Sequence, residues 1–285
     1  MSKAPSPNIL RPNIFVFHDY RLFLNDYFLF LKSKDKSSSI RKISKAAGVS
    51  AAYLSLVLSQ KRSLSDKLAG QVAEALELSA PEQSFFKCIV QLDEAPNQAE
   101  RLKALQNIKR FTQYQQANEN QIEAFNYMSK WYYVAIRELA AHPEFSDDTK
   151  WIQKQLVKHV PANEITKAMH FLVDHGFLIK NENASYTQTN RNLECHGGIH
   201  QISLTQFHRQ ILEITNELID QLPKEKRNLT GYTYMMAPES YDEVTQLLED
   251  VKLKLQAIED RDRKQNGNKK VYHVEMITIP LTGKR

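Results

Sequence analysis

Apolar residues recur every three to four positions along most of the chain, which is the spacing of amphipathic helices. In the N-terminal third, this spacing predicts helices over residues 15–32, 40–47, 50–59, 65–76 and 81–92. Gly, Ser or Pro separates each of these segments from the next. The pattern therefore predicts a five-helix bundle that follows a proline-containing leader and ends near residue 95.

The middle of the chain begins with a polar helix expected at 98–117 and a more apolar one at 121–141. A different order follows: a helix after residue 148, a helix at 162–174, Gly176, and two short strand-like runs. These runs, 177–180 and 186–189, flank the polar turn Asn181-Glu-Asn-Ala. Helix, helix and hairpin in this order are typical of a winged helix.

The last part of the chain is expected to combine helices and strands. A glycine-containing loop at 191–200 precedes a helix at 201–221, and a helix at 238–261 lies between strands at 231–236 and 271–279. We therefore expect a mainly α fold with a smaller α+β part: an N-terminal helix-turn-helix bundle, a middle winged-helix-like unit and a C-terminal β-α-β element. The expected domains are a leader (1–13), a helix-turn-helix domain (14–95), a linker helix (96–119), a winged-helix-like domain (120–190) and a C-terminal α+β domain for regulation or dimerisation (191–285).

The helix expected at 238–261 has an apolar seam with alternating spacings of four and three residues. The seam consists of Val244, Leu248, Val251, Leu255 and Ile258. Such a seam packs either on the helix's own strands or against a partner copy. Packing on the neighbouring strands is the favoured alternative, because two heptads are short for a free-standing coiled coil.

The basic charge of the chain is concentrated in one short window. The formal net charge is +5, but residues 32–67 contain nine Lys and Arg against two acids, a net +7, which leaves −2 for the remainder. A local excess of this kind suits a surface that binds a polyanion.

Several features favour a cytoplasmic protein. No apolar run approaches the roughly 20 residues that span a bilayer, and residues 1–7 lack the apolar core of a secretory signal. The two cysteines, Cys88 and Cys195, lie in unrelated contexts and suggest no disulfide framework. We expect no contact with a membrane.

Within the basic window, residues 40–59 have the pattern of a helix-turn-helix. Gly48 suits the turn, because glycine takes left-handed backbone angles without steric cost. Ser50 can cap the second helix. Small apolar residues at fitting positions would fill the wedge between the two helices: Ile43, Ala47, Val49, Leu54 and Val57.

This pattern predicts which residues would face double-stranded DNA. The second helix of such a motif enters the major groove, and basic residues around it meet phosphates. The expected base-facing residues are Ser50, Ala51, Ala52, Ser55, Ser59 and Gln60. The expected backbone contacts are Arg41, Lys42, Lys45, Tyr53, Lys61 and Arg62. Alanine and serine read bases weakly, so specificity would come from Gln60, DNA shape or a second module.

The chain resembles a bacterial family of regulator-like proteins with an N-terminal helix-turn-helix (Cro/repressor-like) and a C-terminal domain of unknown function. The segments that carry the resemblance are Tyr20-Arg-Leu-Phe-Leu, the run from Ser50 to Ser65, Phe85-Phe-Lys-Cys-Ile-Val, Trp131-Tyr-Tyr-Val-Ala-Ile-Arg-Glu-Leu, the stretch from Ala168 to Leu178, and Ile279-Pro-Leu-Thr. The resemblance implies a two-part transcription regulator. It implies no known ligand, cofactor or catalytic residue.

Other groups of residues suggest weaker alternatives. The winged-helix-like unit could present Asn163, Thr166 and Lys167 to DNA, but nearby acids favour a structural or dimerising role. The cluster Cys195-His196, His200 and His208 could suggest a metal site, but Gly197-Gly198 disfavours the helix that would align it, so we expect no metal.

No phosphate-binding loop, nucleophile elbow or metalloprotease motif is present, so we expect neither an enzyme nor a cofactor. The leading hypothesis is a homodimeric, DNA-binding transcription regulator, with a small molecule or protein as effector of its C-terminal half. The competing hypotheses are an adaptor whose helical bundle docks a protein and, less favoured, an enzyme with its site in the C-terminal half.

Overall fold

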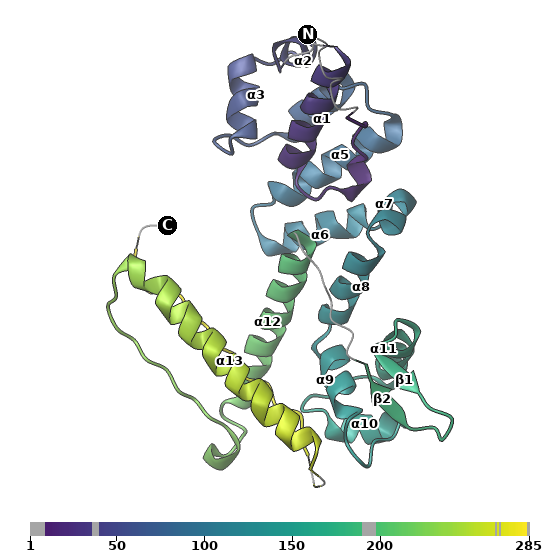
Figure 1. The fold of residues 1–285 in the computed structure, drawn as a ribbon, viewed down its shortest axis with the longest axis vertical. Helices are drawn as coiled ribbons and strands as arrows, with labels where there is room; N and C mark the ends of the chain where they lie inside the picture. Colours follow the sequence, from purple (N-terminus) through teal and green to yellow (C-terminus); the bar gives the residue numbers. More distant parts are fainter. Residues whose placement is uncertain (1–8, 36–39, 190–197, 266, 268, 284–285) are drawn as a thin grey trace, which may run out of the picture. The chain divides into compact units, whose positions relative to one another are not determined.

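The computed structural model describes residues 9–35, 40–189, 198–265, 267 and 269–283. Its described residues are mainly helical, with one two-stranded antiparallel sheet (Figure 1). This confirms the expected mainly α fold with a small β part. The chain divides into two compact units. Unit 1 contains the described residues up to Phe125 and the start of helix α12 as far as Ile202, and unit 2 contains the remainder.

Unit 1 consists of short helices around one aromatic core. Its elements are η1 (Ile14–Val16), α1 (Tyr20–Lys34), α2 (Ile40–Ala46), α3 (Ala51–Leu58), α4 (Asp66–Ala75), α5 (Ala80–Asp93), α6 (Gln98–Ile108), α7 (Thr112–Ala117) and most of α8 (Glu119–Met128). Tyr20, Phe23, Phe85, Phe86 and Tyr114 are fully buried. Their rings meet in tilted and edge-on pairs, the geometry that aromatic quadrupoles favour.

Local sequence signals fix where several of these helices begin. The Asp19 side chain accepts hydrogen bonds from the backbone N–H groups of Arg21 and Leu22 at the start of α1. Ser79 and Glu82 form a capping box at the start of α5. Each cap satisfies N–H groups that the first helical turn leaves without a partner.

Unit 2 combines helices with the small sheet. Its elements are α9 (Trp131–Leu139), α10 (Thr149–Gln155), α11 (Ala162–Asp174), β1 (Leu178–Lys180), β2 (Tyr186–Gln188), most of α12 (Gly198–Leu218), η2 (Lys224–Lys226), η3 (Pro238–Ser240) and α13 (Tyr241–Arg263). In the antiparallel hairpin, Ile179 pairs with Thr187. Apolar residues of α9, α10, α11 and β1 form its core, including Ile136, Ile152 and Leu172.

Two long helices expected from the sequence are each broken into two. The segment 98–117 forms α6 and α7, and the segment 121–141 forms α8 and α9. At the second break, the Gln210 side chain of α12 accepts a hydrogen bond from the Trp131 N–H (3.1 Å) and donates one to the Ser129 carbonyl (3.0 Å). A side chain distant in sequence therefore satisfies backbone groups that a continuous helix would have paired.

The prediction of a C-terminal β-α-β element is wrong for its two strands. The helix expected at 238–261 is present as α13, but residues 231–236 and 271–279 belong to no strand in the described chain. Their composition favours an extended backbone. A strand also needs a neighbour that completes its hydrogen-bond ladder, and neither segment has one.

Two further observations concern the loop expected at 191–200 and the length and apolar character of the helices. Most of the loop expected at 191–200 lies outside the described residues, and α12 begins at Gly198. Among the helices described, not one combines the length and the apolar character that crossing a bilayer requires.

Candidate nucleic-acid interface

Helices α2 and α3, referred to below as the α2–α3 pair, are joined by a tight turn at Gly48. Gly48 has φ +68°, in the left-handed region that glycine enters at little cost. The Val49 N–H donates to the Ser44 carbonyl (2.9 Å) and the Gly48 N–H to the Lys45 carbonyl (3.2 Å). These bonds close the end of α2, as left-handed glycine caps do.

The turn is followed at once by a capped helix. The Ser50 side chain accepts a hydrogen bond from the Tyr53 N–H (3.1 Å) at the start of α3. Four of the five residues expected in the wedge between the helices are buried, and Val49 is half-buried. The buried four are Ile43, Ala47, Leu54 and Val57. Burial on this side leaves the opposite side of α3 to solvent.

The residues expected to face bases lie mostly on that exposed side. Ser50, Ala52, Ser55, Ser59 and Gln60 are exposed, and Ala51 is half-buried. Gln60 has φ +60°, so it ends α3 in a left-handed turn. Leu56, which the sequence pattern did not single out, is also 39% exposed on this helix. The exposed side chains of α3 are therefore mostly small, and some bear hydroxyl groups while others are apolar.

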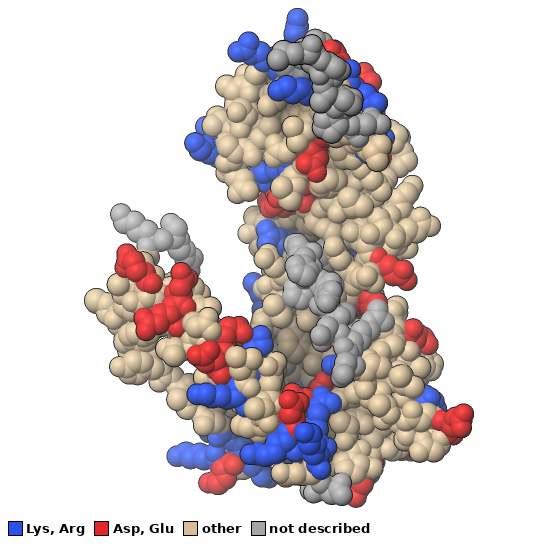
Figure 2. Space-filling view, viewed as in Figure 1, with Lys and Arg blue, Asp and Glu red and all other residues tan. Residues whose placement is uncertain are grey.

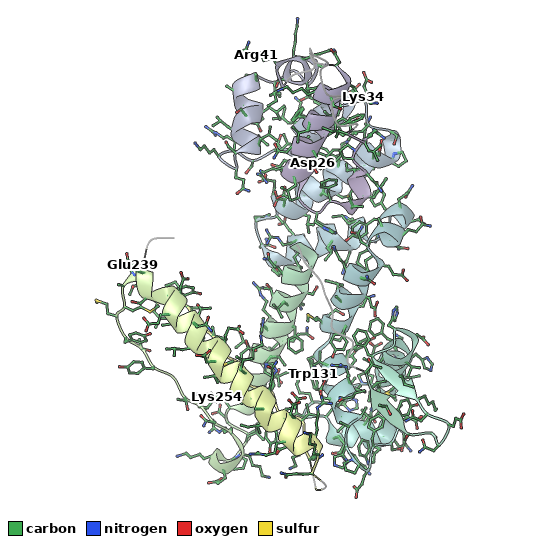
Figure 3. All side chains as sticks on the ribbon, viewed as in Figure 1. Asp26, Lys34, Arg41, Trp131, Glu239 and Lys254 are labelled. Carbon is green, nitrogen blue, oxygen red and sulfur yellow. The ribbon has the colours of Figure 1, made fainter. Side chains whose placement is uncertain are left out.

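All five basic residues of the expected backbone contacts are exposed: Arg41, Lys42, Lys45, Lys61 and Arg62. Lys42 lies 3.5 Å from an Asp35 oxygen. Figure 3 labels Arg41 and Lys34 at the same end of unit 1, where Figure 2 shows several basic side chains. The charges concentrated in the sequence are therefore available to solvent on the surface around the α2–α3 pair.

Tyr53, expected to contact the DNA backbone, is half-buried. Its hydroxyl donates to the Ser63 carbonyl (2.7 Å). This hydrogen bond ties α3 to the loop that contains Lys61 and Arg62, so Tyr53 fixes the position of these two cations relative to the helix.

Arg21 of α1 holds the end of α3 in place, and sequence reasoning missed this role. Its Nε donates to the Val57 carbonyl (2.9 Å) and one Nη to the Arg62 carbonyl (3.4 Å). The guanidinium also pairs with Asp93 and, at 2.5 Å, with Glu94. These partners lie 36 to 73 positions away, and no local spacing signals contacts of that range.

The environment of Glu94 favours its charged form. Burial raises the pKa of this carboxyl, but hydrogen bonds from Ser63 and Tyr20 and the charge of Arg21 lower it, and the net shift is downward. The carboxylate is therefore a stable counter-ion for Arg21, which in turn fixes the loop after α3.

The segment 148–190, expected to be a winged-helix-like unit, shows a surface of mixed charge on α11. Asn163, Thr166 and Lys167 on α11 are exposed, as a DNA reader would require. The Lys167 ammonium, however, lies 2.8 Å from Glu164, which also accepts a hydrogen bond from the Tyr132 hydroxyl (2.9 Å). Because an acid on this face neutralises the lysine, the α11 surface is less suited to phosphate than that of the α2–α3 pair.

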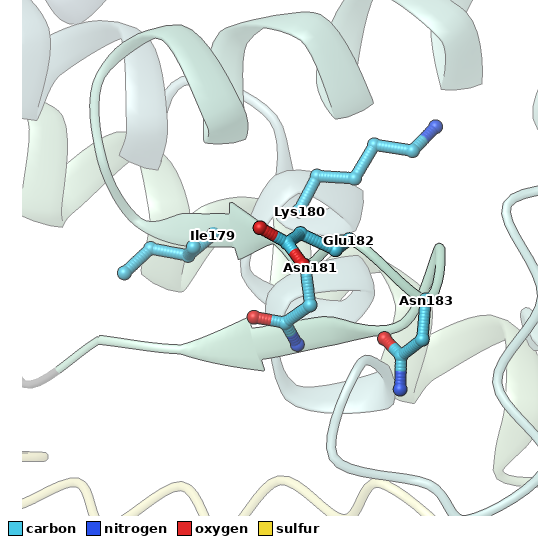
Figure 4. A pocket seen from close by; sticks show the side chains of 5 residues that line it. All are labelled: Ile179, Lys180, Asn181, Glu182 and Asn183. Atoms are coloured by element: carbon cyan, nitrogen blue, oxygen red, sulfur yellow. The ribbon is translucent and has the colours of Figure 1, made fainter.

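The turn between β1 and β2 forms an open depression rather than an enclosed site. Its lining runs from Ile179 to Asn183, and Figure 4 shows Lys180 and Asn181 projecting to different sides of the hairpin. An open depression of this kind differs from the enclosed, mostly apolar pockets that bind small molecules.

The residues considered for a metal site are only partly described. Cys195 and His196 lie outside the described residues, as does the side chain of His200. The His208 Nδ1 lies 2.8 Å from a Glu275 oxygen. Within the described chain, no group of three or more His, Cys, Asp or Glu could hold a metal ion.

The chain matches a family described as "Domain of unknown function (DUF4423)" over residues 100–281, well over half of its length. It therefore belongs to this family, and the expectation of a C-terminal domain of unknown function is confirmed. Comparison with curated proteins and with solved structures gives no significant match. The α2–α3 pair lies before the matched region.

Proposed function

We propose that this protein is a transcription regulator that binds double-stranded DNA through the α2–α3 pair, which we interpret as a helix-turn-helix. The observation that carries the proposal is the exposed face of α3, flanked on both sides by exposed cations. Phosphate contacts supply most of the affinity of such proteins, and cations on both sides of one short helix can reach both walls of a groove.

In the proposed complex, α3 enters the major groove from its N-terminal end. Ala52 can contact a thymine methyl, and Ser55 can hydrogen-bond to more than one base edge, so direct readout by the helix is weak. Gln60 can make a more selective contact, and the shape of the DNA supplies further discrimination. We expect moderate sequence preference on top of strong electrostatic binding.

The test is the salt dependence of binding to a labelled duplex of about 30 base pairs. We expect affinity to fall steeply between about 50 and 200 mM salt. Lys61→Ala and Arg62→Ala should each weaken binding to all sequences alike and lower the slope of log K against log salt by about one for each α2–α3 pair bound.

Lys103→Ala is the matched control, because Lys103 is an exposed lysine of unit 1 on α6, outside the α2–α3 pair. It should leave both the affinity and the salt slope unchanged. Binding to duplex DNA that is negligible at 50 mM salt, or equal effects of the Lys61 and Lys103 substitutions, would contradict the proposal.

A protein-docking adaptor is the second candidate, and exposed Leu56 on α3 favours it. An exposed apolar side chain on a helix can serve as an anchor in the groove of a partner protein. Leu56→Lys distinguishes the two functions: it should preserve or strengthen binding to DNA, whereas it should abolish docking of a protein on the same face.

A further inference from the structure

Residues 228–281, here called the arm, lack a core of their own. The arm consists of α13 with one extended segment before it and one after it (Figure 1). None of its described residues is buried, although α13 alone has 23 residues. Elsewhere in unit 2, the helices α9 to α11 each bury apolar residues.

Most of the large hydrophobic residues that the described chain exposes lie in this arm. They are Leu229, Tyr232, Tyr234, Met235, Tyr241, Leu247, Val251, Leu253, Ile258, Val271, Tyr272, Val274, Ile277, Ile279 and Leu281. Met235 is 99% exposed and Tyr232 is 85% exposed. Concentrated apolar surface of this kind marks an interface, since single exposed hydrophobic residues are normally scattered.

The two extended segments of the arm also lack backbone partners in the described chain. In the described chain, no backbone–backbone hydrogen bond involves residues 228–236 or 270–281. An extended, apolar segment with free N–H and C=O groups is ready to pair with another chain. The arm therefore needs both apolar and hydrogen-bonding partners.

Helix α13 presents an apolar seam that suits a partner helix. Tyr241 precedes the seam predicted from the sequence and extends its alternating spacing to six positions, from Tyr241 to Ile258. Tyr241, Val251 and Ile258 are 47%, 42% and 46% exposed, and the other three positions are half-buried. The arm's own extended segments thus cover the seam only in part.

The charges of α13 indicate which partner fits. Every charged residue from 239 to 250 is acidic, whereas residues 251–264 have five basic residues and three acids. Figure 3 labels Glu239 at one end of the arm and Lys254 further along α13, and Figure 2 shows acidic side chains over the end nearer Glu239. A helix with one acidic and one net basic half complements a second copy of itself in antiparallel orientation.

We propose that a second copy of this chain docks on the arm, with α13 packed against α13 in antiparallel orientation. Tyr241 then lies opposite Ile258 of the second copy, and Val244 lies opposite its Leu255. Leu248 lies opposite Val251 of the second copy, so every layer of the seam is apolar. The same patch is used by both copies, as two-fold symmetry requires.

The extended segments complete the interface. Six seam positions are few for a free-standing coiled coil, and the exposed residues of 229–235 and 271–281 add apolar area and backbone hydrogen-bonding groups. Two contacts within unit 2 connect the arm to β2 and α12. Arg263 donates to the Gln188 side chain (2.9 Å), and His208 lies 2.8 Å from Glu275. The inference rests on the proposed function only in that a dimer presents two α2–α3 pairs to DNA.

The first test measures the mass of the full chain without DNA, by sedimentation over a range of concentrations. Wild type should have twice the 33.0 kDa mass of one chain. Val251→Glu places a charge in the centre of the seam and should weaken the dimer by about 100-fold or more. Ala257→Glu is the matched control: Ala257 is exposed on the same helix, outside the seam and outside the exposed large hydrophobic residues, so this variant should stay dimeric.

The second test fixes the orientation by cross-linking under oxidising conditions, with Cys88 and Cys195 both replaced by serine. A chain carrying Tyr241→Cys and Ile258→Cys should form a disulfide-linked dimer. The two sites are about 25 Å apart along one helix, so the bond cannot form within a chain. Tyr241→Cys alone should not cross-link, because the two Tyr241 positions lie at opposite ends of the antiparallel pair.

A wild-type chain that stays monomeric up to about 100 µM, where even a weak dimer would form, would overturn the proposal. So would a Val251→Glu variant that stays as dimeric as wild type, and cross-linking by Tyr241→Cys alone would overturn the antiparallel arrangement. Because these measurements contain no DNA, their failure is distinct from failure of the DNA-binding proposal.

Discussion

Single residues decide the geometry on which the proposed interface depends. Gly48 makes the turn, Ser50 starts α3, and Arg21 holds the end of α3 through two backbone carbonyls. Gly48 and Arg21 are not among the residues expected to contact DNA, whereas Ser50 is expected both to cap the helix and to face a base. Their contribution is to place the exposed face of α3 and the loop after it in one fixed arrangement, which reduces the entropy lost on binding.

Gly48→Ala should destabilise the α2–α3 pair by about 1 kcal/mol, because alanine resists the left-handed conformation. A Cβ at this position meets no atom within 4 Å, so the backbone angle alone causes the loss. The measurement is native-state hydrogen exchange of amides in α3, which reports the local free energy of opening. Gly48→Asn should lose less, since asparagine tolerates positive φ; equal losses would rule out the backbone angle as the cause.

His18 should make unit 1 sensitive to acid. Its Nε2 lies 2.8 Å from the Tyr114 hydroxyl, and burial lowers the pKa of the imidazole from 6.5 to about 4. The unfolded chain therefore takes up this proton at a higher pH than the folded chain does. As the pH falls from 6.5 to 4, the contribution of His18 to the free energy of unfolding should decrease by at most about 1.4 kcal/mol per pH unit, with no further loss from His18 below pH 4.

Two measurements check the behaviour of His18. A titration of the ring protons by NMR should give a pKa of about 4, and it should stay low in Tyr114→Phe because burial, not the hydrogen bond, is the cause. His18→Gln should lose less stability than wild type between pH 6.5 and 4 in urea unfolding. A wild-type pKa near 6.5 would contradict the explanation by burial.

At the scale of elements, helices follow from the sequence where local spacing and caps determine them. The α2 to α5 helices and the strand pair of the hairpin lie within a few residues of their predicted positions. The long predicted helices 98–117 and 121–141 are each broken in two, and at the second break Gln210 bonds to the backbone from 79 positions away. When a distant side chain replaces a backbone hydrogen bond of a helix, the spacing of apolar residues along the sequence does not reveal it.

The candidate site is predictable to the same extent. Its turn, cap and cations follow from residues 40–62, and the structure leaves the cations exposed. The Arg21 contacts and the Tyr53–Ser63 hydrogen bond are not predictable, since they depend on packing between elements. The strands expected at 231–236 and 271–279 fail for a related reason: composition favours extension, but pairing depends on a neighbouring strand, and the described chain pairs none with these segments.

At the scale of the whole molecule, the two proposed functions, DNA binding and dimerisation, are separated along the sequence. The excess positive charge lies in residues 32–67, whereas the matched family region, 100–281, contains the apolar arm. A single short helix pair would neutralise few phosphates, so under the proposed function one copy would bind DNA weakly under cellular salt. Dimerisation through the arm would double the number of phosphate contacts without any change in the α2–α3 pair.

This division predicts that Val251→Glu weakens DNA binding without touching the DNA-contacting surface. The monomeric variant should bind a duplex of about 30 base pairs with about half the salt slope of wild type, because one α2–α3 pair releases half the counterions of two. Lys61→Ala should show the opposite combination, a reduced slope with an unchanged dimer mass. Both quantities come from fluorescence titrations over a salt series alongside sedimentation. If Val251→Glu is monomeric but keeps the full wild-type slope, then only one copy contacts DNA at a time, and the arm serves an association unrelated to reading the duplex.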